Sequence, residues 1–283
     1  MRAPMIRPAA VAGSWYPGTR GALEHEVDRL LAAAKVSPLR DVVALISPHA
    51  GMMFSGGVAA HAYRAVAEQD VDTVVLVGPS HYVGFEGVAI YPEGGFETPL
   101  GVAEIDRDVA ARLMAASPLI RPHAPAHARE HSLEMQLPFV QRVLSARIVP
   151  MAIGSQTRAT ITALAKALAQ ALEGRRALIV ASTDLSHFFD AKRAEKLDGL
   201  VRQFVEAFDA EGLLNEFESY PEHERGRYVA CGGGAAIAAM LAARTLGASA
   251  GRVLRYAHSG DVSGDRSAVV GYLAAAFTRA AVH

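Results

Sequence analysis

The sequence Leu45-Ile46-Ser47-Pro48-His49-Ala50-Gly51 carries an apolar run into a proline and then a histidine. Two later stretches resemble it: Leu76-Val77-Gly78-Pro79-Ser80-His81-Tyr82, and Leu178-Ile179-Val180-Ala181-Ser182-Thr183-Asp184-Leu185-Ser186-His187, which lacks the proline. Continuous runs of Val, Ile and Leu are typical of buried parallel strands, and ligands bind beyond the carboxyl ends of such strands. We therefore expect three strand ends to deliver three imidazoles to one site.

The composition excludes several classes of protein. The chain has 283 residues, 51% of them hydrophobic, and a net charge of -1, so it lacks the basic footprint of a nucleic-acid-binding protein. Its single cysteine, Cys231, excludes an internal disulfide framework and suits a reducing cytosol. The first residues contain no apolar stretch, and the most apolar helical segment, 232–246, is too short to span a bilayer. We expect a cytoplasmic protein with no signal peptide and no membrane segment.

Strand patterns alternate with helix patterns along the whole chain. No Pro/Ser-rich linker or charge run divides it, which predicts a single α/β domain over residues 1–283, with a central, largely parallel sheet flanked by helices. The strands are expected at 42–47, 73–78, 147–153, 176–182, 253–259 and 268–277, with a β-excursion at 84–102. The helices are expected at 20–35, 58–68, 106–116, 133–144, 157–173, 191–208, 210–219 and 235–246, with a glycine-containing turn at 51–57 before the second.

Three residues form a candidate ligand set for a metal. His49 and His81 follow predicted strands in near-matching contexts, and Cys231 lies just before a glycine-rich helix start. Backbone N–H groups and the helix dipole favour thiolate over thiol at such a position. Two imidazoles and a thiolate suit Fe(II), Cu or Zn(II), with positions left open for water or substrate. The alternative is that the histidines cap strand ends and that Cys231 is a small buried residue without chemistry.

His187 differs from the other two histidines. It follows Asp184 by three residues in a turn rich in Ser, Thr and Asp, a setting suited to an oriented, titratable imidazole. We interpret it as a general acid or base beside the metal, and a role as fourth ligand stays open.

The stretch Glu130-His131-Ser132-Leu133-Glu134 is a further candidate. Ser132 is predicted to cap the helix at 133–144 and to place Glu134 in its first turn, so that Glu134 serves either capping or the site. A four-residue histidine spacing, at His123, His127 and His131, makes only a weak metal motif, because prolines at 122 and 125 disfavour a helix there.

Trp15 and Tyr16 are the distinctive residues of an otherwise loop-like N-terminal segment. The only tryptophan of the chain, next to a tyrosine, either lines a pocket or anchors the N-terminal arm to the core. Both interpretations are open from the residues alone.

These motifs together resemble the Memo family. The residues that carry the resemblance are His49 in Ser-Pro-His-Ala-Gly, His81 in Gly-Pro-Ser-His, the stretches 130–134 and 182–187, Cys231 in Ala-Cys-Gly-Gly-Gly, and the flanking 13–17 and 256–261. Eukaryotic members are known as mediators of cell motility. Prokaryotic members are known as AmmeMemoRadiSam system protein B, and they are often encoded beside a radical-SAM protein and an AMMECR-type protein.

The resemblance implies a fold similar to that of class III extradiol dioxygenases, which are non-heme iron enzymes. It implies a metal bound by His49, His81 and Cys231, most simply Fe(II), with His187 as the acid/base histidine next to the metal site. Asp184 and His131 join the expected catalytic group, and Trp15, Tyr16 and Tyr82 are expected to contact the substrate. Cys231 stands where those dioxygenases have a glutamate, so ring cleavage does not carry over.

Three functions follow as expectations. The first is a metal-dependent oxidoreductase of extradiol-dioxygenase type, in which His187 moves a proton. The second is a non-catalytic module that binds a peptide or protein at the pocket mouth, where Trp15 and Tyr16 stack on an aromatic side chain. The partner expected at the pocket is a small molecule or a peptide that the sequence does not identify. The third is a protein that binds redox-active iron or copper without turnover. A metal-assisted hydrolase is weaker, since no separate carboxylate base is placed as in H-E-x-x-H enzymes.

Overall fold

A computed structural model describes residues 5–280; the ends of the predicted domain, 1–4 and 281–283, lie outside the described residues. Its main sheet has nine strands in the order β10-β12-β2-β9-β3-β8-β4-β7, with β11 paired to β12. The strands of this sheet are β2 (Val42–Ser47), β3 (Thr73–Pro79), β4 (Val88–Ile90), β7 (Ile120–Pro122), β8 (Arg147–Ile153), β9 (Ala177–Ser182), β10 (His187–Phe189), β11 (Ala248–His258) and β12 (Val269–Arg279).

The sheet is mixed, which corrects the prediction of a largely parallel one. Its central strands, in the order β2-β9-β3-β8, are parallel, as the apolar runs indicate. The outer strands differ, because β12 runs antiparallel to β2, β10 and β11, and β4 runs antiparallel to β8. The parallel centre is nevertheless what places the polar turns after β2, β3 and β9 at one edge of the sheet.

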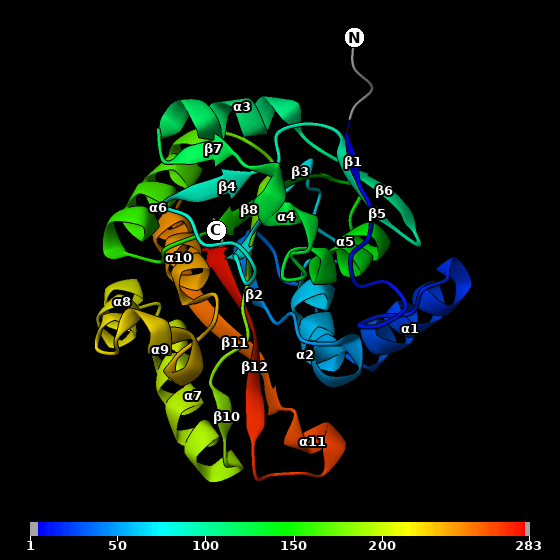
Figure 1. The fold of residues 1–283 in the computed structure, drawn as a ribbon, viewed down its shortest axis with the longest axis vertical. Coiled ribbons are helices and arrows are strands. Elements are labelled where there is room, and N and C mark those ends of the chain that lie inside the picture. The colour runs from blue at the N-terminus through cyan, green and yellow to red at the C-terminus, as the bar shows by residue number, and fades with distance from the viewer. Residues whose placement is uncertain (1–4, 281–283) are drawn as a thin grey trace.

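Helices cover both faces of the sheet. Figure 1 shows α6, α7, α8 and α10 along one side and α1, α2 and α5 along the other. The helices are α1 (Arg20–Ala33), α2 (Met52–Ala65), α3 (Arg107–Ala116), α4 (Ala124–Ala128), α5 (Leu137–Val143), α6 (Arg158–Leu172), α7 (Ala191–Glu206), α8 (Ala210–Glu218), α9 (Glu222–Tyr228), α10 (Gly233–Thr245) and α11 (Gly260–Ser263). Among residues 5–280, no single helix has the length and hydropathy of a membrane span, although α9 and α10, bent by 80° at the break between them, pass such a test when joined.

The glycine-containing segment 51–57 is not a separate turn, because α2 already begins at Met52. A Cβ on Gly56 would lie 2.9 Å from Cδ1 of Leu30, a residue of α1. The glycine therefore lets the two helices pack closely. The same early start brings Met52 and Met53 to the loop that carries His49.

The predicted helix at 133–144 is broken. A 3-10 turn, Glu134–Gln136, precedes α5, and Ser132 does not cap it. The Ser132 hydroxyl instead donates to the carbonyl of Pro79, 3.0 Å away, and so ties this segment to the end of β3.

A second, smaller sheet joins the N-terminal arm to the middle of the chain. It consists of β1 (Ile6–Arg7), β5 (Gly95–Thr98) and β6 (Gly101–Glu104). Arg7 follows the arm into the protein, where its side chain is buried. This arm carries Trp15 toward the turns after β2 and β3.

Candidate metal centre

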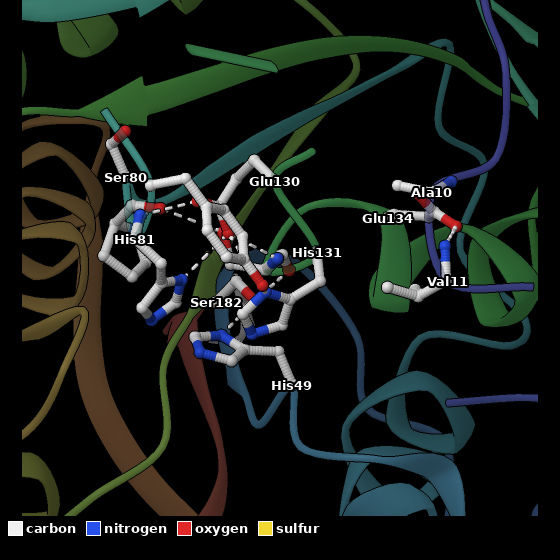
Figure 2. Close-up of polar contacts among 12 residues, drawn as sticks. Ala10, Val11, His49, Ser80, His81, Glu130, His131, Glu134 and Ser182 are labelled. Atoms are coloured by element: carbon white, nitrogen blue, oxygen red, sulfur yellow. Dashed lines mark hydrogen bonds and ion pairs between the residues drawn. The ribbon is translucent and has the colours of Figure 1, made fainter. Parts of the chain in front are cut away.

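The turns after β2 and β3 carry His49 and His81. The parallel strands β2 and β9 pair Ser47 with Ser182, and β3 lies on the other side of β9, so the three strand ends lie side by side. The ring centroids of His49 and His81 are 5.3 Å apart. The three strand ends therefore lie together, as expected, and Figure 2 shows His49, His81 and Ser182 near one another.

A buried hydroxyl sets the tautomer of His49. Ser182 Oγ lies 2.9 Å from His49 Nδ1, 2.6 Å from the carbonyl of Ser132 and 2.8 Å from Nε2 of Gln136. The hydroxyl has one hydrogen, which goes to the carbonyl, so His49 Nδ1 must donate to the oxygen. The other ring nitrogen, Nε2, keeps its lone pair and faces Cys231 Sγ at 3.3 Å.

A buried carboxylate orients His81 in the same way. Glu130 is 1% exposed, and its oxygens accept from Nδ1 of His81 at 2.9 Å, from the backbone N–H of His81 at 2.6 Å and from that of Ser132 at 2.8 Å. Burial alone would raise the pKa of Glu130, but the hydrogen bonds from His81 have the larger effect and lower it to about 2. Glu130 therefore stays a carboxylate and engages Nδ1, so Nε2 is the His81 nitrogen that would bind a metal. Burial lowers the pKa of His81, but hydrogen bonds with Cys231 and Glu130 raise it to about 10, so a metal would take the place of the Nε2 proton.

Cys231 completes the set from the loop before α10. Its backbone N–H donates to the carbonyl of Asp184 (3.2 Å), and the backbone N–H of Asp184 points at Sγ from 3.4 Å. Gly232 allows this approach, since a Cβ there would lie 2.5 Å from the carbonyl oxygen of Ser182. Burial raises the pKa of the thiol, but electrostatic interaction and hydrogen bonding with His49, and hydrogen bonding with His81, lower it to about 6.

The donor atoms of His49, His81 and Cys231 all lie within 4.8 Å of one another, a spacing suited to one ion. His81, Glu130 and His131 form a second group of that spacing. The Glu130 oxygens in that group are already engaged by three N–H donors. The donor set of two imidazoles and a thiolate fits a metal better, because both imidazoles have Nδ1 engaged and Nε2 left for a metal, and the thiol is disposed to ionise.

A pocket of about 500 Å³ lies in front of these residues. Its lining includes His49, His81, His131, Asp184 and His187, together with apolar side chains. The pocket gives a metal-bound molecule a place next to the candidate ligands.

Asp184 holds the loop that carries His49. Its Oδ1 accepts from the backbone N–H groups of His49 (2.8 Å) and Ala50 (3.3 Å). Burial raises the pKa of Asp184, opposed first by the charge of His187. The residue thus positions one candidate ligand and borders the pocket together with His187.

His187 reaches the pocket from β10, a three-residue strand that the sequence pattern does not predict. Its Nδ1 is buried and has no hydrogen-bond partner among the described residues. The strand β10 pairs with β12 at the sheet edge, not with the parallel centre. His187 thus comes to the pocket from a strand other than those that lead to His49 and His81.

His131 lies between the candidate ligands and the N-terminal arm. Its ring centroid is 4.5 Å from that of His81 and 4.3 Å from that of Trp15, and its Nδ1 is 3.2 Å from the hydroxyl of Tyr82. Burial, then electrostatic interaction with the nearby His49 and His81, lower the pKa of His131 to about 3. His131 is therefore neutral and can exchange a hydrogen bond with Tyr82, which lies outside the pocket lining.

Of Trp15 and Tyr16, one lines the pocket and the other anchors the N-terminal arm. Trp15 is 36% exposed and lines the pocket, whereas Tyr16 is 4% exposed and donates its hydroxyl to Oε1 of Glu134 at 2.6 Å. Burial, then this hydrogen bond, raise the pKa of Tyr16. Glu134 also forms a buried ion pair with Arg7 and accepts from the backbone N–H groups of Ala10 and Val11.

Glu134 therefore anchors the arm and neither caps a helix nor enters the metal site; Figure 2 shows it apart from the histidines. The residues that sequence reasoning missed are Ser182 and Gln136, which act on His49, and Phe188, which joins the pocket lining. The sequence feature that could have identified Ser182 is its position at the end of an apolar strand, where the structure pairs it with Ser47.

Comparison with known proteins agrees over nearly the full length. The family described as Memo-like protein matches residues 7–276. A MEMO1 family protein of Methanothermobacter thermautotrophicus is 38% identical, over 95% of this chain and 99% of its own length. MEMO1 family proteins of Methanopyrus kandleri and Nitrosopumilus maritimus are 36% and 33% identical, over 97% and 96% of this chain and the whole of theirs. The chain therefore belongs to the Memo family.

Proposed function

We propose that this protein is a metal-dependent oxidoreductase that binds Fe(II) through His49, His81 and Cys231, with copper or zinc as alternative metals. The observation that carries the proposal is the convergence of three donor atoms within 4.8 Å, with the Nδ1 atoms of both histidines occupied by Ser182 and Glu130. Such orienting partners are characteristic of metal-binding histidines.

The donor set favours a redox role. A thiolate is softer than the carboxylate of the common two-histidine iron sites, and it suits iron, copper or zinc. Iron bound here would supply one-electron chemistry toward O2 and the substrate. With three protein ligands, positions remain for molecules from the pocket.

The surrounding residues are assigned roles around such a metal. His187 takes up or releases the substrate's proton, because its imidazole borders the pocket beside the candidate ligands. Asp184 positions the loop that carries His49, and its carboxyl group interacts electrostatically with His187. His131 is neutral, forms a hydrogen bond with Tyr82 and offers another to a ligand at the pocket wall. Trp15 packs against the His131 ring.

Metal analysis of anaerobically purified protein tests the assignment. We expect about one equivalent of iron in the wild type and its loss in Cys231→Ser. Iron-loaded wild type is then expected to consume O2 with a member of a phenol panel, while His187→Ala keeps the metal and loses most of the turnover. Retention of the metal in Cys231→Ser, or no O2 consumption across the panel, contradicts the respective part of the proposal.

A binding module on the same fold is the second candidate. It is favoured by the exposure of Trp15 and Met53 beside the pocket, 36% and 70%. This function predicts capture of a peptide or small molecule that survives His187→Ala, with no O2 uptake. Metal storage without turnover predicts iron or copper binding that no small molecule alters. A functional link to a radical-SAM protein and an AMMECR-type protein is part of the proposal in each case.

A further inference from the structure

Phe188 has a backbone conformation that its side chain disfavours. Among the described residues, three that are not glycine have positive φ angles: Asp41 at 55°, Phe188 at 62° and Phe208 at 53°. This left-handed region costs an ordinary L-residue free energy, though aspartate adopts it more readily. Phe208 recovers that cost by packing, since it is 4% exposed and its ring lies 4.9 Å from that of Phe277.

Phe188 has no comparable packing, because it is 66% exposed. A large apolar side chain is thus held in solvent by a strained backbone. Strain of this kind concentrates at functional sites, where the surrounding structure imposes it.

The strain arises at a β-bulge. His187 pairs with Val270 and Phe189 with Val269, so three residues of β10 face two residues of β12, and Phe188 is the extra one. Such a left-handed bulge position is normally filled by glycine.

The bulge changes where the side chains point. Successive residues of a regular strand point to opposite faces, yet His187 and Phe188 both border the 500 Å³ pocket. A bulge next to a site is a known means of redirecting a side chain. Here it adds an exposed ring to the pocket beside the titratable His187.

The pocket offers flat surfaces around this position. Trp15, Phe54 and Phe188 line it together with the imidazoles, and Met53 adds a polarisable apolar side chain. Rings pack on one another through offset or edge-to-face contacts that saturated groups do not reproduce. The pocket therefore favours a flat, uncharged ring over an aliphatic group of equal size.

We propose that Phe188 is a specificity-determining residue that contacts a flat, uncharged ring of the ligand, and that the bulge exists to place this contact beside His187. The inference rests on the proposed function, since the pocket is the space in front of the candidate metal. It adds the ring-bearing class of ligand and a residue that selects it.

Benzyl alcohol and cyclohexylmethanol form a matched pair of probes, with the same substituent on a flat and a saturated ring. Trp15, the only tryptophan of the chain, lines the pocket, so its fluorescence reports occupancy. We expect the wild type to bind benzyl alcohol about fivefold or more tightly than cyclohexylmethanol. Phe188→Leu is expected to lose this preference, while Phe208→Leu, which alters the other left-handed phenylalanine, keeps it.

Phe188→Gly separates strain from packing. It removes the ring and relieves the backbone, so its urea midpoint is expected to equal or exceed that of the wild type, whereas Phe208→Gly lowers the midpoint. Equal affinities for the two probes in the wild type, an unchanged preference in Phe188→Leu, or a midpoint for Phe188→Gly as low as that of Phe208→Gly overturns the inference.

Metal content, measured on every preparation, keeps the two proposals apart. Wild type without a metal that still prefers benzyl alcohol contradicts the metal assignment alone, and metal-loaded wild type without the preference contradicts the ring contact alone. N-acetylphenylalaninamide carries the same ring on a peptide unit. Tighter binding of this compound than of benzyl alcohol assigns the ring to a peptide side chain, and weaker binding assigns it to a small molecule.

Discussion

Oγ of Ser182 lies 2.9 Å from Nδ1 of His49, and this contact determines which nitrogen of His49 is free for a metal. The hydroxyl's only hydrogen goes to the carbonyl of Ser132, so the imidazole must donate. Residues at the ends of two strands, β2 and β9, thereby position one candidate ligand atom. Glu130 does the same for His81 with a full charge.

Ser182→Ala removes the acceptor of His49. We expect metal affinity to fall by about 10- to 100-fold, because the imidazole is no longer held in one tautomer and orientation. Titration with Zn(II) against a competing chelator measures the change. Thr73→Val is the matched control, since it deletes another buried hydroxyl, whose partner is Asp106, away from the ligands. An equal loss of affinity in both variants contradicts the orienting role.

Glu130→Gln keeps the shape of the side chain and removes its charge. The neutral amide is a weaker acceptor for His81 Nδ1, so the basicity of the ligand falls, and we expect a loss of metal affinity of about tenfold or more. The same chelator competition measures it. Wild-type affinity in this variant would show that Glu130 supports the backbone alone, through its bonds to the N–H groups of His81 and Ser132.

Glu134→Gln tests the other buried glutamate. It leaves Arg7 charged and buried without its partner, so we expect a loss in the free energy of unfolding of about 3 kcal/mol or more. Urea denaturation measures it. The metal affinity of the folded variant is expected to stay near that of the wild type, because Glu134 contacts the N-terminal arm and none of the three ligands. A selective loss of metal binding without destabilisation is the contrary result.

His127 is expected to make the protein sensitive to acid. Burial lowers its pKa from 6.5 to about 4, so the unfolded chain binds more protons than the folded protein between these values. The contribution of neutral His127 to the free energy of unfolding is therefore fully present above about pH 6.5. It is lost as the pH drops toward 4, by at most about 3 kcal/mol. His131, with its pKa also lowered, acts in the same direction.

His127→Phe removes one of the two titrations. The phenylalanine fits among Tyr91 and Phe96, whose rings lie 5.5 and 5.9 Å from that of His127. The measurement is the slope of the free energy of unfolding against pH between 4 and 6.5, which does not depend on the variant's absolute stability. We expect a shallower slope than in the wild type, and an unchanged slope refutes the assignment.

The sequence was informative where local pattern and topology coincide. Apolar runs that end in His49 and His81 identified parallel strands, and parallel strands place their ends together whatever lies between them. Cys231 followed from the glycines at the start of α10. These residues could be named because each stands at the end of a regular element.

The remaining features depend on distant contacts. Glu134 is separated from its partners Arg7 and Tyr16 by more than a hundred residues, so a local pattern could only suggest a helix cap. The three-residue strand β10 is held by pairing with β12 and contains a phenylalanine where glycine is usual, which hides both the strand and the bulge. The antiparallel outer strands likewise depend on pairing partners that apolar runs do not specify.

X-ray absorption at the iron edge of the anaerobically loaded protein tests the central claim most directly. A metal held by His49, His81 and Cys231 requires one sulfur scatterer at about 2.3 Å, as for thiolate ligands generally, with nitrogen scatterers nearer the metal. We expect that sulfur shell in the wild type and its disappearance in Cys231→Ser. A spectrum of wild-type protein with bound iron and only nitrogen or oxygen neighbours would contradict the account, because the metal would then lie elsewhere.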